Sequence, residues 1–169
     1  SNDYNEDTTN ENYAFGNSLQ VVYDDTKTVS FYGELKADIS EDVTFGVDGT
    51  FSSYTNDIQS EAWNLPAVKL NANVDFNITE KWYAGAKVFF VGERKDQKLN
   101  TDLVNITVPS PITLDSYFDV NAHVGFKYND QLTAFLKANN ITNKGYQKWL
   151  DYPVQGFQIV LGANYKFDF

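Results

Sequence analysis

Long runs in which apolar and polar residues strictly alternate dominate this sequence and restrict the folds available to it. The clearest run covers residues 68–78, where every second residue is apolar and the residues between them are Lys, Asn or Asp. A period of two is that of a β-strand with one apolar and one wet side, whereas a helix would scatter these residues around its circumference. Similar runs lie at 29–39, 43–51, 118–128 and 157–169, and weaker β-like patterns lie at 18–24, 82–93 and 131–141.

The expected strands are unusually long. There are about eight of them, and most have roughly 10–13 residues, about twice the length of a typical globular strand. Eleven residues span roughly 36 Å at about 3.3 Å per residue. A tilt of about 40° lowers this to a height of about 27 Å, close to the apolar band of a transmembrane barrel. We therefore expect an all-β fold, an antiparallel up-and-down meander of about eight long strands, forming a transmembrane β-barrel or a section of a larger one.

The connections between the expected strands alternate in length. The short ones lie at 40–42, 79–81 and 129–130, and the long ones, which hold all four prolines, lie at 54–66, 94–115 and 142–155. Strict alternation places every short turn at one end of a meander, as in outer-membrane barrels with short periplasmic turns and longer outer loops. We expect the strand region to cover residues 18–169. We expect the acidic lead-in at 1–17 to be poorly ordered.

Composition narrows the classes of function. A net charge of −10 argues against a nucleic-acid partner, because phosphate binding needs a basic surface. The chain has no cysteine, which excludes disulfides and thiolate chemistry. No apolar run approaches the roughly 18 residues of a spanning helix, and no signal peptide opens the sequence. The chain is then a mature protein, an internal fragment or a cytoplasmic protein.

The C-terminal part of the sequence resembles a known family. Residues 137–146 read KANNITNKGY, 152–157 read YPVQGF and 162–167 read GANYKF. In this order they resemble the C-terminus of TonB-dependent outer-membrane receptors, although the Arg of the family's usual Pro-Gly-Arg step is absent from Pro153–Gly156. Residues 61–67 and 82–94 are also similar to that family, so the likeness covers roughly residues 18–169.

The resemblance implies a place and a function. The chain would be the C-terminal barrel section of a receptor in the Gram-negative outer membrane that imports a siderophore, a cobalamin-like compound or a glycan. Members of the family are several times longer and carry a plug domain and a TonB-binding box. This section would therefore be inactive alone, would meet TonB only through upstream parts, and would have membrane lipid and the outer-membrane assembly machinery as partners. We expect neither enzymatic activity nor a cofactor.

Three groups of residues are candidates for functional contacts. Aromatic side chains in the long loops are placed to contact a ligand, although they are equally suited to packing loops together or lying at the membrane interface. The apolar residues of the clearest run are expected to face lipid, and the final aromatic series resembles a signature for barrel assembly. The loop aromatics are Trp63, Trp149 and Tyr152, the lipid-facing residues are Val68, Leu70, Val74 and Phe76, and the C-terminal series is Tyr165, Phe167 and Phe169.

The polar residues favour structural roles over chemistry. His123 is the only histidine, and alternation places it on the wet side of its strand, where a single imidazole makes no convincing metal site. Carboxylates lie beside lysines on the wet sides of the strands, as in a charge-balanced barrel interior. The Asn-Ile-Thr triplets at 77–79, 105–107 and 140–142 match the glycosylation sequon but are interpreted as turn chemistry. The sequence therefore indicates no catalytic and no metal-binding residue.

Two other architectures fit the pattern. A self-contained eight-stranded outer-membrane barrel would have a structural or adhesive role. A soluble, lipocalin-like barrel would turn its apolar residues inward around a small ligand. An isolated section of a larger barrel would instead expose two strand edges, which invite pairing with another copy of the chain.

Overall fold

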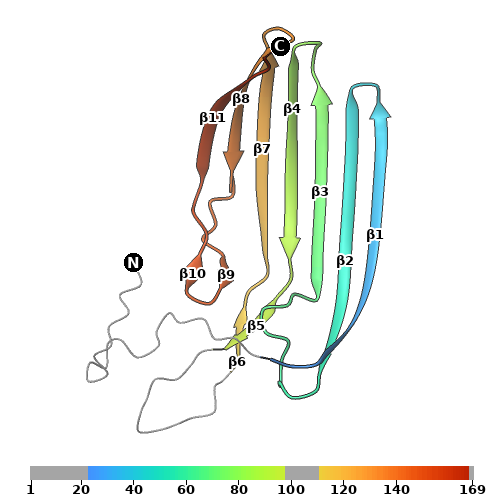
Figure 1. Ribbon diagram of the computed structural model, residues 1–169, viewed down its shortest axis with the longest axis vertical. Helices are drawn as coiled ribbons and strands as arrows, with labels where there is room; N and C mark the ends of the chain where they lie inside the picture. The colour runs from blue at the N-terminus through green and yellow to red at the C-terminus, as the bar shows by residue number, and fades with distance from the viewer. Residues whose placement is uncertain (1–22, 98–110, 168–169) are drawn as a thin grey trace, which may run out of the picture.

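The long strands form a single antiparallel sheet. The computed structural model describes residues 23–97 and 111–167, and in it seven strands pair in the order β1-β2-β3-β4-β7-β8-β11 (Figure 1). Each strand is antiparallel to the neighbours it pairs with, which confirms the predicted all-β, up-and-down meander. The strands are β1 (Thr26–Ser40), β2 (Val43–Asn56), β3 (Val68–Asn77), β4 (Trp82–Val91), β7 (Tyr117–Lys127), β8 (Leu132–Asn139) and β11 (Gln158–Tyr165).

Two small hairpins lie in the long connections, where the sequence pattern predicts only loops. Strand β5 (Arg94–Gln97) pairs with β6 (Pro111–Leu114), and β9 (Gln147–Trp149) pairs with β10 (Tyr152–Pro153). Figure 1 shows both hairpins at the end of the sheet opposite to the short turns. Strands of two to four residues show too little alternation to be recognised in a sequence.

The short turns share one chemical device, which explains why their sequences echo one another. In each turn a side-chain oxygen at the first turn residue accepts hydrogen bonds from backbone N–H groups two or three residues later. Ser40 accepts from Asp42. Thr79 accepts from Lys81 and Trp82, and Asn129 accepts from Gln131 and Leu132. Thr79 therefore stabilises a turn, as expected from the interpretation of the Asn-Ile-Thr triplet at 77–79 as a turn sequence.

The strand register separates polar and apolar side chains onto opposite faces of the sheet. One row across five strands consists of Thr44, Asp75, Gly85, His123 and Lys137. A second row, three residues further along each strand, consists of Val47, Ala72, Val88 and Val120. Because side chains alternate along each strand, the first row lies on a polar face and the second on an apolar face. We call these the polar face and the apolar face.

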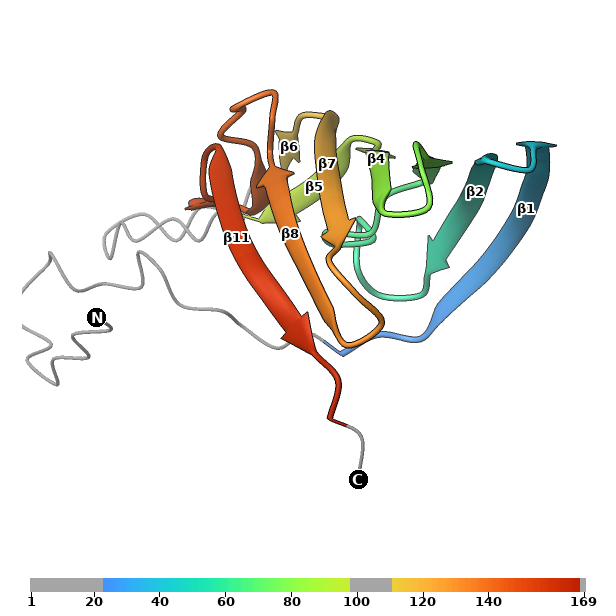
Figure 2. The ribbon, with the colours of Figure 1, turned by 90° about the horizontal axis from the view of Figure 1, so that it is seen from above.

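The sheet does not close on itself within the described residues. Strand β1 pairs only with β2, and β11 pairs only with β8. Viewed from above, the sheet bends into an open arc with β1 and β11 at its two ends (Figure 2). Of the expected strand at 18–24, Tyr23 and Asp24 are described and lie outside any strand, and the other residues lie outside the described ranges, as does the lead-in at 1–17.

The distribution of burial is the reverse of that in a water-soluble sheet protein. Among the described residues, the buried hydrophobic side chains are Leu114 and Tyr117, and no side chain is completely buried. Arg94, Asp119 and Asn140 are buried although they are polar. Large apolar residues of the apolar face are exposed, among them Phe31, Leu35, Phe51, Phe118 and Leu161. The chain by itself therefore buries its loop end and leaves its apolar face uncovered.

Within residues 23–97 and 111–167, no helix is long and apolar enough to cross a membrane.

Candidate functional site

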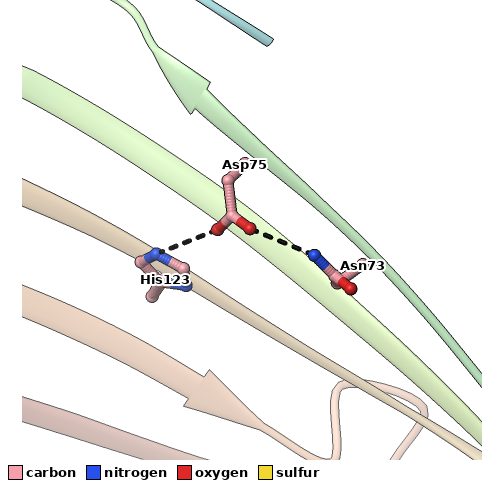
Figure 3. A network of polar contacts seen from close by, with 3 residues as sticks. All are labelled: Asn73, Asp75 and His123. Carbon is pink, nitrogen blue, oxygen red and sulfur yellow. Dashed lines mark hydrogen bonds and ion pairs between the residues drawn. The ribbon is translucent and has the colours of Figure 1, made fainter. Parts of the chain in front are cut away.

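The middle of the polar face carries a small network centred on Asp75. Its Oδ1 lies 3.9 Å from Nε2 of His123, and its Oδ2 accepts a hydrogen bond of 3.2 Å from Nδ2 of Asn73 (Figure 3). Strand β4 contributes Gly85 between them, where a Cβ would lie 2.5 Å from atoms of both Asp75 and His123. Glycine is therefore required for the two side chains to approach each other across β4. His123 lies on the polar face, as alternation predicts.

Towards the short turns, the polar face holds aromatic rings over glycines. The ring of Tyr83 lies over Gly125, and Lys127 lies 5.9 Å from that ring. Tyr83 and Lys127 border a recess of about 420 Å³ that is also lined by Asn77, Thr133 and Asn164. The recess and Tyr83 lie on the polar side of the sheet, whereas Trp82 lies on the apolar face against Phe126.

The long connections meet the polar face at a buried aromatic cluster. The rings of Tyr117 and Tyr146 stack in parallel at 3.8 Å, and the guanidinium of Arg94 lies 4.9 Å from the centre of the Tyr117 ring. Tyr146 also donates a hydrogen bond of 2.8 Å to Oδ2 of Asp119. Burial, followed by this hydrogen bond to a carboxylate, raises the pKa of Tyr146 well above its usual range. We call these four residues the aromatic cluster.

The segment 146–150, which belongs to the third long connection, receives contacts from the other two. Nη2 of Arg94 donates to the carbonyl of Gln147 at 2.7 Å. Oδ2 of Asp96 accepts from the backbone N–H of Leu150 at 2.9 Å. Asn64, in the connection between β2 and β3, donates through Nδ2 to the carbonyl of Lys148 at 2.9 Å, and its own N–H donates to Lys95. The three connections are thus tied together.

Asn140 fixes the base of the last connection. It has a positive φ of 47° and is buried. Its Nδ2 donates to the carbonyls of Lys144 and Gln155, and its Oδ1 accepts from Thr142 and from the N–H of Lys144. Asn residues tolerate this left-handed conformation and bond to nearby backbone groups. The Asn-Ile-Thr-Asn motif of the sequence is therefore the anchor of a loop.

The aromatic residues expected to contact a ligand lie in two different connections. Trp149 and Tyr152 face each other across the β9–β10 hairpin and are 52% and 41% exposed. Trp63 donates its indole N–H to the side chain of Gln59 at 3.0 Å, and its backbone forms an isolated parallel β-bridge with Lys95. The hairpin presents two aromatic rings to the outside, whereas Trp63 helps to hold its own loop.

The residues expected to face lipid lie on the apolar face. The expected C-terminal aromatic series lies in β11 and after it. Val68, Leu70, Val74 and Phe76 lie on the apolar face, and Leu70 and Phe76 are 38% and 40% exposed. Tyr165 and Phe167 are exposed and meet edge to face at 4.8 Å. Phe169 lies outside the described residues. In the described ranges, no three His, Cys, Asp or Glu side chains come together as metal ligands.

The fold is similar to that of a section of several outer-membrane siderophore receptors. The ferripyoverdine receptor FpvA of Pseudomonas aeruginosa superposes with a TM-score of 0.70 at 14% identity over 84% of this chain and 20% of the receptor. For the siderophore receptor PirA of Acinetobacter baumannii, the TM-score is 0.68 at 20% identity, over 82% of this chain and 22% of PirA. The import receptor Fiu of Escherichia coli K12 gives 0.64 at 15% identity, over 83% and 21% of the two chains.

These comparisons confirm, at the level of fold, the resemblance to the C-terminal barrel region of TonB-dependent receptors. The chain spans about a fifth of the length of the receptors it matches. No protein-family model and no curated protein sequence matches the chain.

Proposed function

We propose that this chain is the C-terminal barrel section of a TonB-dependent receptor that imports a ferric siderophore across the Gram-negative outer membrane. The observation that carries this proposal is the pairing of an exposed apolar face with a polar face covered at one end by the long connections. A lipid bilayer outside and water inside is the environment that suits both faces.

The apolar face has the chemistry of a lipid contact. Exposed contiguous apolar surface is unfavourable in water and marks a binding or membrane surface. We propose that Val68, Leu70, Val74 and Phe76 contact acyl chains. Tyr165 and Phe167, together with Phe169, would be recognised by the outer-membrane assembly machinery.

The cargo is proposed from the solved structures that share the fold. FpvA is described with bound ferripyoverdine, and Fiu as a ferric-catecholate import receptor. At the end of its sheet that carries the long connections, this chain exposes Trp149 and Tyr152, whose rings are suited to stacking on a flat or ring-bearing ligand. Import itself would belong to the complete protein, in which upstream parts would contact TonB. We assign no catalytic role to this chain.

The burial pattern favours this proposal over a lipocalin-like soluble barrel. Such a barrel would enclose its apolar residues around a ligand. Here the side chains that the connections cover, Tyr117 and Asp119, belong to the polar face, and Phe118 between them is exposed.

Fractionation and uptake together test the proposed function. The complete gene product should sediment with the outer membrane and should shift in gel mobility on heating, as β-barrels do. Cells that carry it should accumulate ⁵⁵Fe from a ferric siderophore in a TonB-dependent manner, and cells without the gene should not. Recovery of the protein in the soluble fraction would refute the membrane assignment, and membrane insertion without uptake of any ferric siderophore would refute the cargo.

A further inference from the structure

A lysine of the last long connection lies against the apolar face of the sheet. The ammonium of Lys144 is 4.4 Å from the centre of the Phe118 ring. Phe118 is the second residue of β7, belongs to the apolar face and is 40% exposed. It lies at the end of the sheet that carries the long connections (Figure 1). Tyr146, two residues after Lys144, stacks instead on Tyr117 of the polar face. The connection therefore places one positive charge at the border of the apolar face.

The position of Lys144 is fixed by its backbone. The buried side chain of Asn140 accepts a hydrogen bond of 3.2 Å from the N–H of Lys144 and donates one of 3.0 Å to its carbonyl. Ile141 donates its N–H to the carbonyl of Val120 at 2.9 Å, so the segment starts beside β7. Among residues 23–97 and 111–167, no carboxylate lies within ion-pair distance of the Lys144 ammonium. Its charge is therefore held over Phe118 without an anionic partner in this part of the chain.

Lys144 borders a recess of about 710 Å³ at the same end of the sheet. Its apolar lining comes from the apolar face and from the two small hairpins, and consists of Phe90, Phe118, Ile112, Leu114 and Leu150. The charged side chains in the lining are Lys144 and Asp115. Lys95 adds a second ammonium at the edge, because it donates to the hydroxyl of Thr113, which also lines the recess. The recess thus combines apolar walls with two positive charges and one negative charge.

We propose that this recess binds the anionic phosphate headgroup of a membrane lipid, with Lys144 as its cationic contact. The proposal rests on the proposed function, because only a sheet that spans the membrane holds Phe118 where acyl chains end and headgroups begin. A lysine at that level attracts anionic lipid. The recess and the apolar face share Phe90 and Phe118, so one molecule can place its phosphate at Lys144 and its acyl chain along the face. This continuity favours a lipid over a free anion.

Lipid binding to the complete protein in detergent tests this site. Native mass spectrometry at increasing concentrations of phosphatidylglycerol measures the affinity for the first lipid bound, and zwitterionic phosphatidylcholine is the comparison. Lys144→Gln should weaken the binding of phosphatidylglycerol on the order of fivefold, the effect of one lysine near an anionic lipid surface, and Lys144→Arg should retain it. Asp115→Asn should strengthen the binding, because it removes a negative charge from the recess.

Lys148→Gln is the matched control, because Lys148 is an exposed lysine of the same connection that does not line the recess. Equal weakening by Lys148→Gln would show unspecific attraction and would overturn the proposal. Equal wild-type affinity for the two lipids would overturn it as well. Displacement of phosphatidylglycerol by glycerol 3-phosphate, which lacks acyl chains, would identify a site for free anions instead. If Lys144→Gln did not fold, Asp115→Asn would decide, since unchanged or weaker binding in that variant contradicts the proposal.

The lipid site and the proposed function can fail separately. Binding of phosphatidylglycerol that depends on Lys144, in a protein that imports no ferric siderophore, would refute the cargo and support the lipid site. Uptake of a ferric siderophore by a protein whose lipid binding is the same in all variants would support the proposed function and overturn the lipid site.

Discussion

Glycine determines where large side chains can lie flat on the polar face. Gly125 of β7 has the ring of Tyr83 directly over it, and Gly85 has Asp75 and His123 on either side. A side chain at either position would displace a neighbour on the adjacent strand. Gly33 of β1 has no atom within 4 Å of the place where its Cβ would be, so there glycine fills no such role.

Replacing Gly125 with valine should therefore destabilise the sheet, while the same change at Gly33 should not. Overpacking of a closely contacted site costs about 1–3 kcal/mol, and Gly125→Val must move the Tyr83 ring. Thermal unfolding in detergent, followed by gel mobility, measures the difference. Gly33→Val is the matched control, and valine there should be neutral or slightly stabilising, because it suits a strand better than glycine. Equal midpoints for the two variants would contradict the packing described for Tyr83.

Asp24 gives the loop end a dependence on pH. Its carboxylate accepts hydrogen bonds from the N–H groups of Gln59 and Ile58, and the bond from Gln59 contributes most to a pKa below its ordinary value of 3.8. The folded protein thus favours the ionised form. The stabilisation is present above the unfolded-state pKa of 3.8 and is lost as the pH falls through the lower pKa of the folded state.

Protection of the Ile58 and Gln59 amides should accordingly fall below a pH of about 3.8 in the wild type. An Asp24→Asn variant should show the lower protection at neutral pH and little further change on acidification. Amide hydrogen-exchange rates, corrected for the pH dependence of exchange in an unfolded peptide, measure the protection in both proteins. Identical protection in the two proteins at neutral pH would mean that the carboxylate does not hold this loop.

At the scale of elements, alternation was a sufficient guide to the long strands. The run at 68–78 corresponds to β3, Val68–Asn77, because a side-chain period of two follows from strand geometry alone. The positions of the short turns were also predicted, since Ser40, Thr79 and Asn129 form their turns through local hydrogen bonds. Strand alternation and turn hydrogen bonds involve residues close together in the chain, so a single sequence is enough to predict them.

The aromatic cluster was not predicted, because its contacts join distant parts of the chain. Tyr146 and Asp119 are 27 residues apart, and Asn64 and Lys148 are 84 apart. The available signal was the place of Asp119 on the polar side of its strand, close to the loop end, with Tyr146 in the motif that follows β8. Pairing them required the register of β7 and β8, which the alternation does not specify.

Cysteine scanning along β3 tests the two faces at the level of this strand. Leu70→Cys and Phe76→Cys should react with a lipid-soluble thiol reagent and resist a charged one in membranes, whereas Asn71→Cys and Asp75→Cys should react with the charged reagent. The chain contains no native cysteine, so each label reports a single site. Labelling with the same preference at all four sites would contradict the assignment of the apolar face to lipid.

At the scale of the whole molecule, the two edges of the sheet carry backbone N–H and C=O groups that are available to pair with another strand. Strand β1 has 15 residues and, within the described parts of the chain, pairs on one side only, as does β11. Unpaired strand edges bind other strands, so the environment of these edges decides the state of assembly. In a complete receptor, the remaining strands of the barrel would pair with both edges.

A polypeptide of these 169 residues alone should therefore self-associate in detergent. We expect dimers or larger species through β1 and β11, because pairing satisfies backbone groups that are otherwise exposed to the micelle. Light scattering coupled to size-exclusion chromatography measures the mass. A strictly monomeric protein with a closed barrel would show that the edges find each other within one chain.

The scarcity of buried apolar side chains has a consequence for how this chain folds. Only Leu114 and Tyr117 among the described hydrophobic residues are buried, so the sheet has almost no interior of its own to collapse around. The apolar contacts that usually drive folding would have to be supplied by surrounding amphiphile molecules. Refolding should then behave as an association with the host phase, with a rate that rises with the lipid-to-protein ratio and an end point that depends on acyl-chain length.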